Sequence, residues 1–241
     1  MANPVLTRGF QKPSGPLAVE DRMTGPGVTR ATLSLFALFL AAGAWGWFQV
    51  DVSTGLPSWF MVALVVGLGA VIVGMFKPAW ARIIGPVYAV AEGALVGAIS
   101  SVYGTLYDGI VGQAVLGTLL TTVIMAVLYA TRTIRVTEKF RSVVVGATLG
   151  IFVFYMVSLG LSFFNIDIPF LFGGGPIGIL FSVGVIILAA FNLLLDFDLI
   201  ERGVKGGAPA YMNWYAGFGL LVTVVWLYLE ILRLLAKLQR D

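Results

Sequence analysis

The stretch IGILFSVGVIILAAFNLLLDFDLIERG, Ile177–Gly203, places a long run of uncharged residues directly before a cluster of charges. The run is continuous rather than alternating, which is typical of a helix that crosses a bilayer and not of a strand in a membrane barrel. Such a helix needs about 20 apolar residues to cross a hydrocarbon core about 30 Å thick. Asp196 and Asp198 end the run. The reason for two acids at this place has to be sought in the rest of the sequence.

The whole chain shares this apolar character. Of its 241 residues, 59% are hydrophobic and 11% are charged, and its mean hydropathy of +0.97 lies outside the range of soluble domains. The sequence therefore predicts an all-α integral membrane protein with seven transmembrane helices. Residues 31–235 would form one domain, between a flexible cytoplasmic tail over residues 1–30 and a short basic tail over residues 236–241. The predicted helices are Ala31–Val50, Trp59–Phe76, Ile83–Tyr103, Ile110–Ala130, Ser142–Phe163, Ile177–Leu195 and Asn213–Leu235.

The chain contains no cysteine and no histidine. This composition excludes disulfides, thiolate nucleophiles and the usual zinc sites, and it leaves proton chemistry to carboxylates. We therefore expect a protein that is not an enzyme and has no bound cofactor. The net charge of +3 comes from basic residues scattered over short loops beside apolar runs, so it indicates membrane topology and no nucleic acid partner.

Lysine and arginine occur only in alternate loops between the predicted helices. The loops after the first, third and fifth helices contain none, whereas the amino-terminal tail and the other loops all contain some. The positive-inside rule then places the amino terminus and the loop Thr131–Arg141 in the cytoplasm. Seven helices would place the carboxyl terminus outside, where Arg233, Lys237 and Arg240 conflict with the rule. Either the last segment is re-entrant or these side chains snorkel toward water, and we favour one simple crossing.

Pairs of glycines four positions apart occur on two of the predicted helices. Gly93 and Gly97, and likewise Gly146 and Gly150, have the spacing of close helix crossings in membranes. We expect both pairs to pack against neighbouring helices. The segment FGGGPIG that ends at Gly178 is predicted as a loop whose proline stands in the first turn of the next helix.

Two acids lie within predicted helices. Glu92 is in the third, on the order of 14 Å from the cytoplasmic surface at about 1.5 Å per residue. An acid at that depth is costly unless it is protonated, paired or wetted, so Glu92 is a candidate for function. The structural alternative is a protonated carboxyl that forms a hydrogen bond to a neighbouring helix. Glu230 in the last helix has Arg233 three positions on, and we expect these two residues to form an internal ion pair.

Asp196 and Asp198 differ by about 200° around a helix and so face in opposite directions. Asp198 is expected to pair with Arg202, four positions on, at the membrane surface. Asp196 instead shares an apolar, inward-facing stripe with Leu193 and Ile200, which makes it a candidate for function. Three further acids flank loops without basic residues and would give the outer face a negative charge: Asp51, Asp108 and Asp167.

Three motifs resemble the Bax inhibitor-1 family of small seven-helix membrane proteins, and the resemblance covers nearly the whole chain. AVAEGALVG (Ala89–Gly97) resembles the Glu-Gly motif of that family's third helix, LLLDFDLIE (Leu193–Glu201) the acidic end of its sixth, and LYLEILRLL (Leu227–Leu235) its last helix. The resemblance implies two layers of three helices around a central carboxyl-terminal helix. It also implies a divergent, bacterial-type member in the plasma membrane.

The family resemblance further implies a pH-sensitive calcium leak, in which aspartates on the sixth and seventh helices share a proton and gate the pore. The first aspartate maps onto Asp196. Thr223 stands at the second position, and the next acid, Glu230, follows two turns or about 10 Å later. Asp196, Glu92, Glu230 and Thr223 are therefore the candidate gating and pH-sensing residues. Asp196 and Glu92 are also the candidate transient ligands of calcium.

Calcium, protons and the lipid bilayer are thus the expected partners, and no particular protein partner is indicated. Two alternatives to a leak stay open. Acids on the third and sixth helices, Glu92 and Asp196, would also suit a secondary transporter of protons or a small solute that is built from two three-helix repeats. The other alternative is a non-conducting regulator of other membrane proteins.

Overall fold

The computed structural model describes residues 21–50, 55, 57–162, 164 and 175–239. Most of the predicted amino-terminal tail, part of the loop before the sixth helix, and Asp51, Asp167 and Arg240 lie outside these ranges. All seven helices are long and apolar enough to cross a membrane, and the described residues contain no strand, only isolated bridge positions such as Arg22 with Pro209. The predicted all-α membrane fold is confirmed.

The elements are α2 (Gly25–Phe48), α3 (Trp59–Phe76), the 3-10 turn η2 (Pro78–Trp80), α4 (Ala81–Leu106), α5 (Ile110–Ala130), α6 (Glu138–Ser162), α8 (Pro176–Lys205) and α9 (Met212–Leu238).

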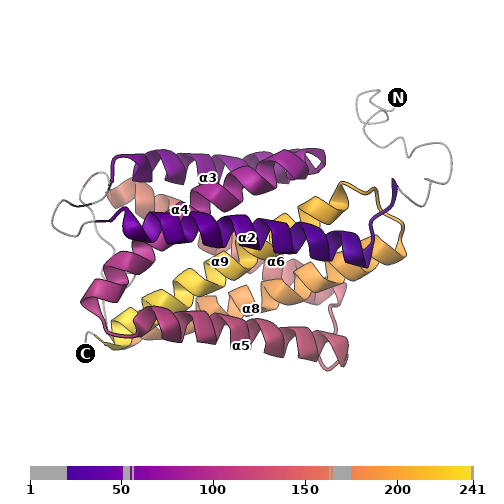
Figure 1. Ribbon diagram of the computed structural model, residues 1–241. Helices are drawn as coiled ribbons and strands as arrows, with labels where there is room; N and C mark the ends of the chain where they lie inside the picture. The colour runs from indigo at the N-terminus through magenta and orange to yellow at the C-terminus, as the bar shows by residue number, and fades with distance from the viewer. Residues whose placement is uncertain (1–20, 51–54, 56, 163, 165–174, 240–241) are drawn as a thin grey trace.

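The helices form two layers with α9 between them (Figure 1). In one layer α4 packs against α2 and α3, and in the other α8 packs against α5 and α6. α9 contacts α2, α4, α5 and α8, and its buried face carries large apolar side chains such as Leu221, Leu227 and Leu232. The expected arrangement of two three-helix layers around a central last helix is therefore confirmed. We call the end of the bundle where α2 begins the amino end, and the end where α9 finishes the carboxyl end.

α2 and α4 touch backbone to backbone, which glycine makes possible. A Cβ atom on Gly93 or Gly97 would overlap a backbone carbonyl oxygen of α2, in the latter case that of Gly43. The predicted packing role of these two glycines is confirmed. For Gly146 and Gly150 of α6 the same prediction is wrong, because the described residues leave open space where their Cβ atoms would stand.

α8 begins at Pro176, as predicted, but it ends at Lys205 rather than at Leu195. Its 30 residues extend over about 45 Å, more than the bilayer core of about 30 Å requires. Asp196 therefore lies about 14 Å before the end of this helix. α8 thus continues past the acidic motif as one unbroken helix.

The residues before α2 form a clasp on the turn between α8 and α9. The Met23 amide donates to the Ala208 carbonyl at 2.6 Å. The Met23 side chain is 2% exposed and packs against Gly203. α2 begins at Gly25, before the predicted Ala31, and the Thr24 side chain caps it by accepting a hydrogen bond from the Gly27 amide.

Candidate functional site

Asp196 lines a cavity of about 430 Å³ between α3, α6, α8 and α9. Its Oδ2 atom is buried and has no hydrogen-bond partner among the described residues. Burial of a carboxyl oxygen without a partner costs free energy, so folding stability alone does not account for this acid. The structure thus places Asp196 inside the bundle, as its apolar stripe predicted, and beside an open space. We call this space the Asp196 cavity.

Thr223 of α9 faces Asp196 of α8 in this cavity. Both residues line it, and the Thr223 side chain lies within interaction range of the Asp196 carboxyl. The Thr223 hydroxyl donates to the Gly219 carbonyl at 3.1 Å, which leaves its oxygen lone pairs as acceptors. A hydroxyl therefore stands where the family resemblance places a second aspartate.

Arg141 of α6 also lines the cavity and is held by Asp198 of α8. Asp198 pairs with Arg202 as well, which confirms the pair that the four-residue spacing predicted. Its residue is only 9% exposed, because α8 continues past it and Arg141 covers it. Asp198 therefore links two helices, and its place relative to the membrane surface stays a prediction.

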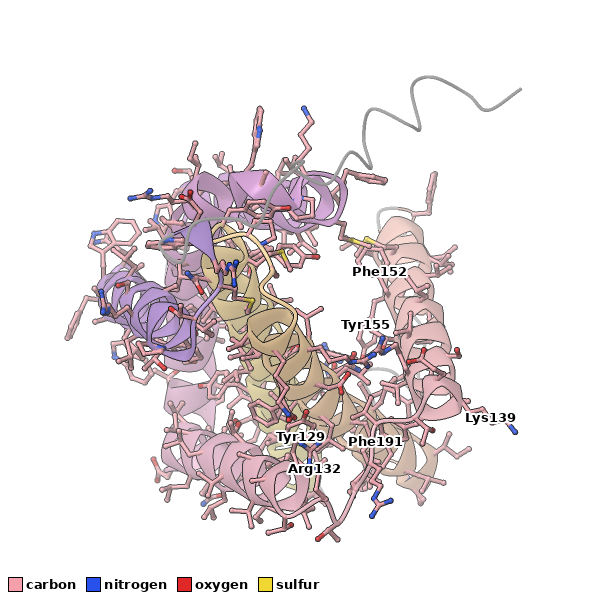
Figure 2. All side chains as sticks on the ribbon, turned by 90° about the vertical axis from the view of Figure 1, so that its right-hand side faces the viewer. Tyr129, Arg132, Lys139, Phe152, Tyr155 and Phe191 are labelled. Atoms are coloured by element: carbon pink, nitrogen blue, oxygen red, sulfur yellow. The ribbon has the colours of Figure 1, made fainter. Side chains whose placement is uncertain are left out.

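A polar stripe on α6 makes contact with α8 and α9. It consists of Arg141, Thr148 and Tyr155, whose seven-residue spacing is close to two helical turns and puts them on one face. The Asn192 amide of α8 donates to the Thr148 hydroxyl at 2.7 Å. Figure 2 shows Tyr155 turned toward the bundle, while Lys139 of the same helix points away. The sequence reasoning missed this stripe, although its regular spacing is readable in the sequence.

Glu230 belongs to a separate cluster, about two turns along α9 from Thr223. Its carboxylate accepts hydrogen bonds from the Tyr155 hydroxyl at 2.7 Å and from Arg233 at 2.9 Å, which confirms the predicted pair with Arg233. The residue is 1% exposed and is not among those that line the Asp196 cavity. Because its charge already has partners, Glu230 does not replace the missing second aspartate.

Arg233 and Lys237, the described basic residues at the carboxyl end, have partners inside the bundle. α9 is one continuous helix, Met212–Leu238, so the re-entrant alternative is wrong. Lys237 is 2% exposed and donates to the Gly178 carbonyl and the Ser182 hydroxyl of α8, at 2.9 and 3.0 Å. Lys237 and Arg233 therefore do not need to snorkel to water, and they serve helix packing rather than topology.

Glu92 lies on a different surface from Asp196. A Cβ atom added to Gly67 of α3 would stand only 2.7 Å from Oε2 of Glu92. The Glu92 carboxyl therefore packs directly on α3. It is not among the residues that line the Asp196 cavity. The structure therefore does not bring these two candidate calcium ligands together. The described residues also contain no group of three or more acidic side chains that would hold a metal ion.

An ionic network closes the amino end of the bundle between α5 and α8. The Glu201 carboxylate accepts hydrogen bonds from the Tyr129 hydroxyl, from Arg132 and from Lys205. Figure 2 shows Tyr129 and Arg132 on the same side of the bundle. The hydrogen bond and charge of Glu201 hold the pKa of Arg132 above its ordinary value. This network fixes the end of α8 that lies beyond Asp196.

Comparison with known proteins identifies a family. A family model described as Bax inhibitor 1 like matches residues 3–240, nearly the whole chain. The match includes all seven helices and the motifs around Glu92, Asp196 and Glu230. No curated protein and no solved structure matches the chain.

Proposed function

The chain belongs to the Bax inhibitor 1 like family, and we propose that it is a pH-sensitive cation leak of the membrane, with calcium as the conducted ion. The observation that best supports this proposal is the environment of Asp196: the residue lines a cavity, and its buried Oδ2 atom has no hydrogen-bond partner among the described residues. An ionisable group inside a membrane bundle is a candidate for ion or proton movement. The resemblance of LLLDFDLIE to the family's gating motif points to the same residue.

Thr223 would offer Asp196 a different contact in each protonation state. A protonated Asp196 can donate to the Thr223 oxygen while the Thr223 hydroxyl keeps its bond to Gly219. An ionised Asp196 can only accept, so either the Thr223 hydroxyl turns toward it or a cation neutralises it. Loss of the proton would thus change the link between α8 and α9. A free-energy difference of about 5 kcal/mol is enough to move a closed and open equilibrium almost completely.

Calcium would bind only weakly at Asp196. The ion prefers about six to eight oxygen ligands, and the Asp196 cavity offers one carboxylate with neutral oxygens from residues such as Thr223 and Asn192. Calcium would therefore keep part of its water shell. Weak binding suits conduction, because the ion has to leave as well as enter. Glu92 would act as a second transient ligand at a separate place, between α3 and α4.

We place the amino end of the bundle in the cytoplasm of a bacterial cell, because basic residues gather at that end. Arg233 and Lys237 do not oppose this orientation, since both have buried polar partners. The described basic residues at the amino end are Arg22, Arg30, Lys77, Arg82, Arg132, Arg135, Lys139, Arg141, Arg202 and Lys205.

Calcium influx into liposomes tests this proposal. The purified protein is reconstituted around a calcium dye, and influx is measured at about pH 6, 7 and 8, where a perturbed carboxyl would titrate. We expect wild-type flux to depend on pH and the flux of Asp196→Asn to be independent of it. Asp108→Asn is the matched control, because Asp108 is an exposed acid at the carboxyl end.

Two results would speak against the leak. Absence of flux at every pH, in protein that is shown to be folded, would favour the non-conducting regulator. Uptake that saturates and follows a second ion gradient would favour the secondary transporter.

A further inference from the structure

The Asp196 cavity is larger and more apolar than the passage of a hydrated metal ion requires. Its volume of about 430 Å³ falls in the range of about 300–1,000 Å³ that is typical of small-molecule sites. Tyr215, Phe218 and Trp226 line it together with aliphatic side chains. Aromatic faces attract positive charge, so a wall of this kind suits an organic cation.

When Asp196 is ionised, one uncompensated charge stands at this cavity. Arg141 and Asp196 are the charged residues among the described residues that line it. Arg141 is paired with both Asp198 and Glu138, whereas Oδ2 of Asp196 has no partner within the described ranges. A ligand with a single positive charge would satisfy Asp196. An anion would gain little, because the arginine already has its counter-ion.

The cavity opens sideways, between α3 and α6. Met75 of α3 and Val145 of α6 line it and are 58% and 43% exposed. Figure 2 shows the helix that carries Phe152 and Tyr155 standing apart from the opposite layer. Because both helices are of membrane-spanning length, these exposed side chains would meet lipid. A hydrophobic cation that dissolves in the bilayer therefore has a direct route to Asp196.

We propose that the Asp196 cavity binds a bulky hydrophobic monocation of the organic ammonium or phosphonium class. Tight binding of calcium would need a cluster of carboxylates, which the described residues do not contain. A hydrophobic monocation needs one carboxylate and aromatic walls, and this cavity provides both. The inference goes beyond the calcium leak and does not depend on it. In a working leak, a bound monocation would occupy the cavity and block the flux.

Equilibrium binding of radiolabelled tetraphenylphosphonium to the purified protein in a neutral detergent tests this inference. Tetraphenylborate has nearly the same shape and the opposite charge, so it controls for simple apolar partition. We expect saturable binding of one phosphonium per chain. The affinity should fall about tenfold or more in Asp196→Asn, as for the loss of one charge contact, and should not change in Asp108→Asn. Tetraphenylborate should show no saturable binding.

Trp226→Leu is a second variant, which keeps the carboxylate and removes one aromatic wall. We expect its affinity for the phosphonium to fall about threefold or more. Circular dichroism and size-exclusion chromatography establish that each variant is folded. Equal affinity in the wild type and Asp196→Asn, absence of saturable binding, or saturable binding of tetraphenylborate would each overturn the inference. No calcium is present in this measurement, so its failure and the failure of the leak are separate results.

Discussion

Thr223 of α9 lies opposite Asp196 of α8, at the position where the family resemblance places a second aspartate. Glu230, the next acid along α9, has Tyr155 and Arg233 as partners. Asp196 is therefore a single carboxyl that faces a hydroxyl. This relationship decides how the bundle can respond to pH. A single acid binds its proton independently, whereas two acids in contact share a proton and titrate as a pair.

Replacement of Thr223 by aspartate should create the shared-proton pair. Two carboxyl groups in contact cannot both ionise freely, so they titrate as a coupled pair. We expect Thr223→Asp to move the midpoint of the pH dependence of calcium flux in liposomes to higher pH. Asp196→Asn in the same chain should remove that shift. Thr105→Asp is the control, since Thr105 is exposed at the carboxyl end, and an unchanged midpoint in Thr223→Asp would contradict the proposed contact.

Addition of one methyl group at Gly97 should weaken the contact between α2 and α4. The Cβ atom of Gly97→Ala would collide with the Gly43 carbonyl, and overpacking of this kind costs about 1–3 kcal/mol. We expect a lower midpoint of thermal unfolding in detergent. Gly150→Ala is the matched control, because open space surrounds Gly150, and it should leave the midpoint unchanged or raise it. Equal effects of the two variants would refute the close crossing.

Removal of the Tyr155 hydroxyl should loosen α6 from α9. This hydroxyl donates to Glu230 at 2.7 Å and accepts a hydrogen bond from Arg233 at 2.8 Å. Loss of a partner by a buried charged group costs about 1–3 kcal/mol, so the free energy of unfolding of Tyr155→Phe should fall by that amount. Tyr211→Phe, at a residue that is 40% exposed, should change it by less than about 0.5 kcal/mol. A neutral Tyr155→Phe would show that the cluster does not hold α6.

The orientation of the bundle can be measured with single cysteines, because the natural chain has none. Thr133→Cys lies at the amino end, and Gln239→Cys lies at the carboxyl end. If the amino end is cytoplasmic, a membrane-impermeant thiol reagent added to intact cells should label Gln239→Cys and should label Thr133→Cys only after permeabilisation. The reverse pattern would invert the proposed topology.

Structural features that depend only on residues close together in the chain could be predicted from the sequence. The seven helices follow from continuous apolar runs, whose length the bilayer sets. The pairs of Asp198 with Arg202 and of Glu230 with Arg233 follow from spacings of four and three residues on one helix. These local rules need no knowledge of how the helices are placed relative to one another.

Contacts between different helices could not be obtained in the same way. Arg141 and Asp198 are 57 residues apart, so their pairing depends on the placement of α6 against α8. The glycines at 146 and 150 predict a packing face of α6 that the structure does not use. These lie about 200° on either side of Thr148, on the opposite face from the polar stripe. Polar residues that recur every seventh position would have identified the correct face.

The clasp around Met23 has a consequence for biosynthesis. Its partner, the Ala208 carbonyl, emerges from the ribosome only after α8 has been made. Until then the start of α2 lacks this hydrogen bond, and the Met23 side chain has no Gly203 to pack against. Because of this order of translation, the clasp forms late in assembly, at about the stage when the central helix α9 is synthesised.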